Sequence, residues 1–234
     1  MSELTRRVNR LLGQTLRVQV VPGNTRPVRL DTRWFTHVSY FAELLAKVST
    51  LGGDLVECGV ADGVSLSMIS SLNRAISPLE DRTIWGFDAW AGLPSPTEAD
   101  LTHEKSIATA GMFGYTSIRR VREELMGYGW AEADIDKTIK LIPGYFEQTL
   151  PGFQSDIALL HIDADLYDSY RCALVNLWPK VRTGGIVAFD EYEDTEKWPG
   201  ARRAVDEFLG TLAPGVATLH EHRCGKWWVS KQVS

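Results

Sequence analysis

Short apolar runs alternate along this chain with segments in which apolar residues recur at helical spacing. The apolar runs are predicted to be strands, at 54–58, 83–88, 138–142, 157–162 and 185–190. The segments of helical spacing are predicted to be helices, at 36–49, 64–76, 116–128, 166–180 and 199–210. This alternation favours a mostly parallel sheet with helices on both faces.

The pattern changes near the C-terminus. Residues 217–222 alternate apolar and polar side chains, Cys224-Gly225 is typical of a turn, and residues 226–230 follow as a second short strand. Two such strands joined by a turn form an antiparallel hairpin. We therefore expect an α/β fold with a mostly parallel seven-stranded sheet that ends in an antiparallel C-terminal hairpin strand.

Two segments interrupt the alternation. Residues 1–35 mix charged and apolar side chains around Pro22-Gly23, and we interpret them as an N-terminal arm or cap. Residues 89–115 form a long irregular stretch containing several glycines and prolines. At roughly twice the usual upper length of a loop, this stretch predicts a lid over a site, with a floppy insertion as the alternative. Residues 1–234 are otherwise expected to form a single domain.

The composition is that of an ordinary globular protein, with 44% hydrophobic and 24% charged residues. A formal charge of −5 and a pI near 5.6 give no reason to expect nucleic acid as a partner. The cysteine count of 3, without metal-ligand spacing, is typical of reduced intracellular thiols. No long apolar stretch predicts a signal peptide or membrane span, so a cytoplasmic location is expected.

Two of the predicted strands end in paired carboxylates. The run 157–162 leads into Asp163-Ala164-Asp165, and the run 185–189 leads into Asp190-Glu191. If the two strands are parallel neighbours, the four carboxylates converge at one edge of the sheet. Carboxylates repel one another unless a cation lies between them, so a metal site is the first hypothesis. The alternative is that Asp165 caps the helix 166–180, which leaves Asp190-Glu191 unexplained.

The first strand ends in Glu57 and runs into a glycine loop. Gly59 permits a tight turn, and Gly63 lets a ligand approach the helix start closely. The spacing Gly-x-x-x-Gly differs from the dinucleotide pattern, and Asp62 would repel phosphate, so a ligand with a cationic or zwitterionic part is favoured. Asp88 ends the second strand, where an acid commonly accepts hydrogen bonds from a ribose. Alternatively, Asp88 caps the loop that follows.

Six stretches together resemble the macrocin O-methyltransferase family, which comprises metal-dependent sugar O-methyltransferases of macrolide and aminocoumarin biosynthesis. The stretches are VECGVADGVS (56–65), GFDAWAGLP (86–94), GYFEQTLPG (144–152), LLHIDADLYDS (159–169), GGIVAFDEY (184–192) and WPGARRAVDEF (198–208). The resemblance implies the Rossmann-like fold of class I S-adenosylmethionine methyltransferases, and it favours a homo-oligomer.

The resemblance also implies site residues. Asp163, Asp190 and Glu191 would be the metal ligands, with Mg²⁺ as the ion, and Asp165 would be the general base. The family usually has a second Asp where this chain has Glu191. The residues implied at the S-adenosylmethionine site are Glu57 and Gly59 on the methionine side, Asp62, Gly63 and Ser65 in the same loop, Asp88 at the ribose, and Tyr145 and Phe146 near the adenine.

The expected activity is methyl transfer to a sugar hydroxyl of a glycosylated natural product or glycan, with Mg²⁺ orienting and activating a vicinal diol. Catechol-type O-methylation is an alternative for which Trp90, Trp130 and Trp198 could line the acceptor pocket. A catalytically silent cofactor-binding scaffold is another, although it would have no need for four crowded acids. The glycine spacing disfavours a nicotinamide oxidoreductase.

Several further residues are given structural roles. His161 precedes the acids and is interpreted as a core histidine. Arg202 and Arg203 are interpreted as part of a solvated helix face. Trp227 and Trp228 are expected to face opposite sides of the sheet, in structural or subunit contacts. Whether His103 and Lys105 of the lid touch substrate is left open.

Overall fold

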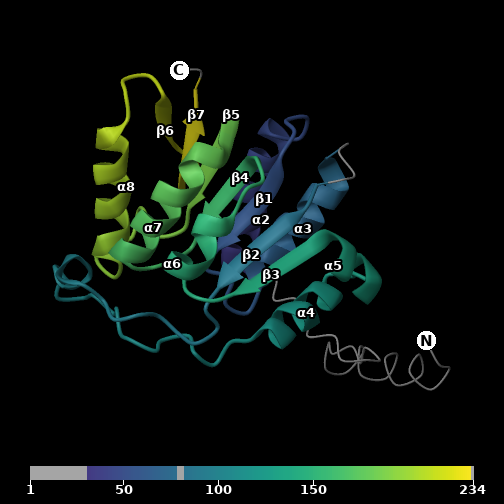
Figure 1. The fold of residues 1–234 in the computed structure, drawn as a ribbon, viewed down its shortest axis with the longest axis horizontal. Coiled ribbons are helices and arrows are strands. Elements are labelled where there is room, and N and C mark those ends of the chain that lie inside the picture. Colours follow the sequence, from purple (N-terminus) through teal and green to yellow (C-terminus); the bar gives the residue numbers. More distant parts are fainter. Residues whose placement is uncertain (1–30, 78–81, 233–234) are drawn as a thin grey trace.

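The computed structural model describes residues 31–77 and 82–232. Their strands form one seven-stranded sheet with the order β3-β2-β1-β4-β5-β7-β6 (Figure 1). The strands are β1 (Asp54–Cys58), β2 (Ile84–Asp88), β3 (Ile139–Pro143), β4 (Ile157–Ile162), β5 (Val181–Phe189), β6 (Ala217–Glu221) and β7 (Trp227–Lys231). The first five are parallel, and β7 lies antiparallel between β5 and β6. The predicted sheet and C-terminal hairpin are confirmed.

The five predicted helices are present with differences at their ends, and two short helices, at 132–138 and 146–149, were not predicted. They are α2 (Thr32–Lys47), α3 (Val64–Ile76), α4 (Ile118–Gly127), α5 (Glu132–Thr138), α6 (Phe146–Thr149), α7 (Tyr167–Leu177) and α8 (Pro199–Thr211). The helix α2 begins at Thr32 rather than at residue 36, because Asp31 caps it by accepting a 2.9 Å hydrogen bond from the Trp34 N–H. Residues 32–35 therefore belong to α2, while the rest of the expected arm, 1–30, lies outside the described residues.

Alternation along the strands divides the core into two layers. Val56, Leu160 and Val187 pack with residues of α7 and α8 on one face of the sheet. Their neighbours Leu55 and Leu159 pack on the other face with α2 and α3. Figure 1 shows α7 and α8 together on one side of the sheet. Because both faces are covered, the central strands are apolar throughout, and polar side chains gather at their ends.

The segment 89–115 is packed against the domain. It contains the 3₁₀ helix η1 (Glu98–Leu101), and it runs along the lower edge of the molecule in Figure 1. The buried carboxylate of Asp100 accepts a 2.7 Å hydrogen bond from the Tyr167 N–H at the start of α7 and a 2.8 Å bond from the Thr97 N–H. A Cβ on Gly200 would lie 1.9 Å from Asp100 Oδ1, so α8 also packs closely here. These contacts argue against the alternative that residues 89–115 are a floppy insertion.

Among the described residues, no helix has the length and apolar character that crossing a membrane would require.

Candidate functional site

A cavity of about 1130 Å³ opens at the carboxyl edge of the sheet, next to the point where the strand order reverses between β1 and β4. Its walls come from the loops after β1, β2, β4 and β5, from the start of α2 and from the segment 89–115. All four predicted acids line it, namely Asp163, Asp165, Asp190 and Glu191. The fold therefore brings together the carboxylates that follow two neighbouring strands.

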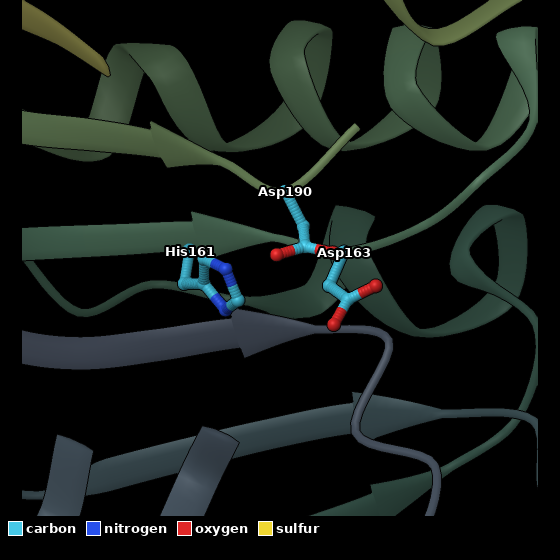
Figure 2. Close-up of side chains that lie close together, drawn as sticks. All are labelled: His161, Asp163 and Asp190. Carbon is cyan, nitrogen blue, oxygen red and sulfur yellow. The ribbon is translucent and has the colours of Figure 1, made fainter. Parts of the chain in front are cut away.

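The acids form two overlapping groups. Ligand atoms of Asp163, Asp165 and Glu191 lie within 4.8 Å of one another, as do those of His161, Asp163 and Asp190. Figure 2 shows the second group, with His161 on β4 and the two carboxylates just beyond the ends of β4 and β5. Asp163 belongs to both groups and is the centre of the cluster.

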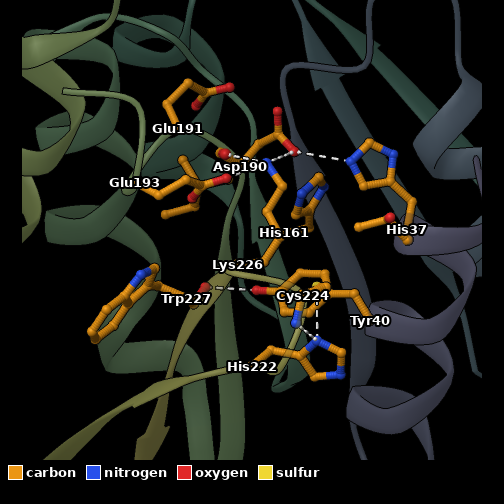
Figure 3. Close-up of polar contacts among 12 residues, drawn as sticks. His37, Tyr40, His161, Asp190, Glu191, Glu193, His222, Cys224, Lys226 and Trp227 are labelled. Atoms are coloured by element: carbon orange, nitrogen blue, oxygen red, sulfur yellow. Dashed lines mark hydrogen bonds and ion pairs between the residues drawn. The ribbon is translucent and has the colours of Figure 1, made fainter. Parts of the chain in front are cut away.

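Two residues of more distant segments contact Asp190. Lys226 Nζ lies 3.0 Å from Asp190 Oδ1 and 2.7 Å from Glu193 Oε1, and His37 Nε2 lies 3.6 Å from the same Asp190 oxygen (Figure 3). Burial raises the pKa of Asp190, but the charge and hydrogen bond of Lys226, together with the imidazoles of His161 and His37, outweigh burial, and the pKa falls to about 2. Burial lowers the pKa of His37 to about 4, so at neutral pH this imidazole is uncharged.

Sequence reasoning missed Lys226 and His37. The expected hairpin strand included Lys226, but nothing in its local pattern linked it to the acids. The link comes from sheet register, because Trp227 pairs with Phe189 and so sets Lys226 beside Asp190. His37 reaches the same carboxylate from the first turns of α2.

The other three acids lack a comparable cation among the described residues. Burial raises the pKa of Asp163 to about 7, with a further rise from the negative charge of Asp190. Burial and neighbouring carboxylates raise the pKa values of Asp165 and Glu191 well above their usual range. The Tyr170 hydroxyl donates a 2.5 Å hydrogen bond to Glu191 Oε2. Burial thus disfavours the ionised forms of these three carboxyl groups, and a bound cation would favour them.

Asp165 adopts an uncommon backbone conformation, with a φ of +58°. Asp and Asn enter this left-handed region more readily than most residues. The other described non-glycine residues with positive φ are Ala61, Trp90 and Phe113, which also lie in loops around the cavity. The alternative role of Asp165 as a helix cap is wrong. Leu166 is the N-cap of α7, and the Tyr167 N–H at the start of this helix donates its hydrogen bond to Asp100. The Asp165 carboxylate remains directed to the site.

Most of the residues predicted at the cofactor line the cavity, namely Gly59, Asp62, Asp88, Tyr145 and Phe146. The Asp88 carboxylate accepts hydrogen bonds from the Ala61 N–H at 2.8 Å and the Trp90 N–H at 2.6 Å, so it also caps the loops as the alternative proposed. Asp62 is paired with Arg120 of α4 at 3.1 Å, which reduces the negative charge that the sequence suggested.

Glu57, Gly63 and Ser65 are placed differently. Glu57 is buried 2.8 Å from His161 Nδ1, and its second oxygen has no hydrogen-bond partner among the described residues. A Cβ on Gly63 would meet Val121 at 2.8 Å, so the glycine permits close packing of α4. Ser65 lines a neighbouring cavity of about 370 Å³ beside α2 and α3.

The structural interpretations hold for the remaining residues. His161 is buried against Phe41 with ring centroids 4.9 Å apart, as expected of a core histidine. Arg203 is exposed and pairs with Glu207. Trp227 packs against Tyr192 and Trp228 stacks on His220, on opposite sides of the sheet. Lys105 of the segment 89–115 pairs with Glu196, a residue of the cavity wall.

Three comparisons with known proteins agree on the family. The sequence pattern of the family described as Macrocin-O-methyltransferase (TylF) matches residues 36–213. The demethyldecarbamoylnovobiocin O-methyltransferase of Streptomyces niveus is 33% identical over 75% of this chain and 65% of its own length. A Streptomyces olivaceus enzyme, named as a 4'-O-methyltransferase of a rhamnosyl tetracenomycin, is 32% identical over 60% of this chain and 53% of its own length. The matched regions thus span less than two thirds of these relatives.

Solved structures extend the likeness to the fold. The calicheamicin methyltransferase CalS11 superposes with a TM-score of 0.72 at 25% identity, over 98% of this chain and 93% of that one. The five parallel strands and the four acids lie within the residues that the family pattern matches. The chain belongs to the macrocin-O-methyltransferase (TylF) family.

Proposed function

We propose that this protein transfers a methyl group from S-adenosylmethionine to a sugar hydroxyl of a glycosylated natural product or glycan, in a reaction that requires Mg²⁺. The observation that carries the proposal is the convergence of four carboxylates on one cavity at the reversal point of the sheet. Family membership and the sugar named for the Streptomyces olivaceus relative support the choice of acceptor.

The cavity has room for a cofactor and an acceptor. Its volume of about 1130 Å³ lies above the range of about 300–1,000 Å³ usual for single small-molecule sites. Asp88 at the end of β2 is suited to the ribose hydroxyls, and the aromatic rings of Tyr145 and Phe146 are suited to the adenine. Gly59 cannot carry a side chain, because a Cβ would lie 1.7 Å from the Asp163 carbonyl oxygen.

The donor set fits Mg²⁺. Asp163, Asp190 and Glu191 offer hard carboxylate oxygens, the ligand type that this ion prefers, and an oxygen of Asp163 lies within 4.8 Å of one on each of the other two. When bound, Mg²⁺ would orient the acceptor and lower the pKa of its reacting hydroxyl. The chain's own contribution is to hold these carboxylates in place, since Tyr170 fixes one oxygen of Glu191 and Lys226 fixes one oxygen of Asp190.

Asp165 is proposed as the general base. Burial raises its pKa, so the ionised Asp165 carboxylate is a stronger base than that of an exposed aspartate. The acceptor hydroxyl gives its proton to the Asp165 carboxylate while its oxygen bonds to the methyl carbon. When bound, S-adenosylmethionine would supply the methyl group and keep the electron pair of the carbon–sulfur bond on sulfur, so that the products would be a methyl ether and S-adenosylhomocysteine. Residues 89–115 are proposed as the lid that excludes water from this step.

The catechol alternative has less support from the site. Trp198 lines the cavity, whereas the Trp90 indole N–H donates to the Ala61 carbonyl and Trp130 packs against Arg74 on α3. Of the three tryptophans that this alternative assigned, only Trp198 is therefore among the residues that line the cavity. The homo-oligomeric state stays a prediction.

The proposal is tested by release of S-adenosylhomocysteine with rhamnosyl glycosides and catechols as parallel acceptor panels. We expect turnover on a glycoside, its loss in EDTA and its recovery with added Mg²⁺. Turnover on catechols alone, or turnover that EDTA leaves unchanged, would contradict the proposal.

A further inference from the structure

A second cluster of reactive side chains lies where α2 meets the turn between β6 and β7. His222 Nδ1 is 2.7 Å from Cys224 Sγ, and His222 Nε2 is 3.1 Å from Glu43 Oε2. Figure 3 shows this imidazole and thiol below Lys226. Among the described residues that line the two cavities, Glu43, His222 and Cys224 do not occur. The cluster is therefore separate from the acid site.

A backbone hydrogen bond determines which ring nitrogen of His222 carries the proton. The Cys224 N–H donates to His222 Nδ1 at 3.2 Å, so this nitrogen carries a lone pair in the neutral ring. The ring proton is then on Nε2 and points to the Glu43 carboxylate. A lone pair faces the thiol and a carboxylate orients the opposite side of the ring. This is the order of nucleophile, base and orienting acid that activates a nucleophile.

The turn holds the thiol in place and leaves part of it in contact with solvent. The His222 N–H donates to the Lys226 carbonyl and the Gly225 N–H donates to the His222 carbonyl, both at 2.8 Å. His222 is buried, with the Tyr40 ring 5.4 Å away, whereas Cys224 is partly exposed. The charged groups around the cluster are Lys47, which pairs with Glu43, and the exposed Arg223.

We propose that Cys224 is an activated thiol and a modification site for small disulfides. The thiol proton passes to His222 Nδ1, and the thiolate attacks one sulfur of a compound R–S–S–R. A Cys224–S–S–R bond forms as the original S–S bond breaks, and the leaving thiolate R–S⁻ recovers the proton from His222. Glu43 stabilises the imidazolium between these two transfers.

The other cysteines provide an internal reference. Cys172 is also partly exposed, but its sulfur contacts the Asn176 amide and, among the described residues, no histidine, and burial raises its pKa. Cys58 is fully buried, and burial raises its pKa well above the usual range. Cys224 and Cys172 are both partly exposed, so a change in the ratio of their rates on substitution of His222 or Glu43 reports on activation of Cys224.

The test measures the rate of mixed-disulfide formation with 2-hydroxyethyl disulfide at each cysteine, by peptide mass mapping of the full chain. We expect Cys224 to react about tenfold or more faster than Cys172. The variants His222→Asn and Glu43→Gln should reduce this ratio. The exposed Glu221→Gln variant in the same hairpin should leave it unchanged. Reduction with dithiothreitol should restore the free thiol.

Equal rates at the two thiols in the wild-type protein would overturn the proposal. A ratio that neither variant changes would overturn it as well. Modification of Cys58 marks unfolding, so if His222→Asn exposes Cys58, the Glu43→Gln ratio decides the outcome, because Glu43 lies at the surface of α2.

Discussion

The ε-ammonium group of Lys226 contacts Asp190 twice, at the carboxylate Oδ1 at 3.0 Å and at the backbone carbonyl oxygen at 2.5 Å. The protein thus supplies one cation to its own acid cluster. The charge of Asp190 is balanced in this way, whereas Asp163, Asp165 and Glu191 are left with raised pKa values. Asp163 and Glu191 are two of the proposed metal ligands, and a bound cation would favour their ionised forms.

Replacing Lys226 with methionine should destabilise the protein. Both side chains of the pair are largely buried, with exposed fractions of 14% and 17%, and a buried carboxylate without its partner costs about 3 kcal/mol. Urea unfolding measures the loss. Lys105→Met breaks the exposed pair with Glu196 and should change the free energy of unfolding far less. Equal effects of the two substitutions would show that Asp190 does not depend on Lys226.

Stability should depend on pH through Asp163, whose pKa rises from 3.8 to about 7. Below pH 4 the carboxyl is protonated in the folded and unfolded chains. Between pH 4 and 7 the unfolded chain loses this proton more readily, so the contribution of Asp163 to stability is lost as the pH rises. Because Mg²⁺ needs the ionised group, it should raise the melting temperature more near pH 8 than near pH 6.

Asp163→Asn is the control for this pH dependence, since it removes the titration and retains the volume of the side chain. Its melting temperature should respond little to Mg²⁺ at either pH. A Mg²⁺ response of wild type that is the same at both pH values would contradict the assignment.

Asp165→Asn should reduce turnover by about 10²–10⁴-fold, the usual contribution of a general base. Asparagine also adopts positive φ readily, so the backbone at +58° should be retained. Titration calorimetry should show Mg²⁺ and S-adenosylhomocysteine affinities close to those of the wild type. Unchanged turnover would remove Asp165 as the base.

Asp100→Ala should loosen the segment 89–115. The substitution removes the acceptor of the Tyr167 and Thr97 N–H groups, and we expect a loss of about 1–3 kcal/mol. Hydrogen exchange should accelerate at residues 97–102. The exposed Glu98→Ala in the same 3₁₀ helix is the matched control. Exchange that is equally slow in both variants would show that other contacts hold the segment.

Local pattern predicted the sheet because a strand covered on both faces is a continuous apolar run, as in β4, where Leu159 and Leu160 lie in opposite layers of the core. The convergence of the acids followed from two neighbouring parallel strands. The contacts of Lys226, Arg120 and Asp100 could not be predicted, because each joins segments distant in sequence through sheet register or helix packing. The helix α5 was missed because it is short and buries a single side chain, Ile135.

The central claim is that the acid cluster binds a divalent cation beside the methyl donor. Calorimetric titration of Mg²⁺ into the protein saturated with S-adenosylhomocysteine tests it most directly. We predict one Mg²⁺ per chain, lost in Asp163→Asn and Asp190→Asn and retained in the exposed variant Asp168→Asn, with cofactor affinity similar in all four proteins. Absence of Mg²⁺ binding by the wild type, or loss of the cofactor instead of the metal in the site variants, would contradict the claim.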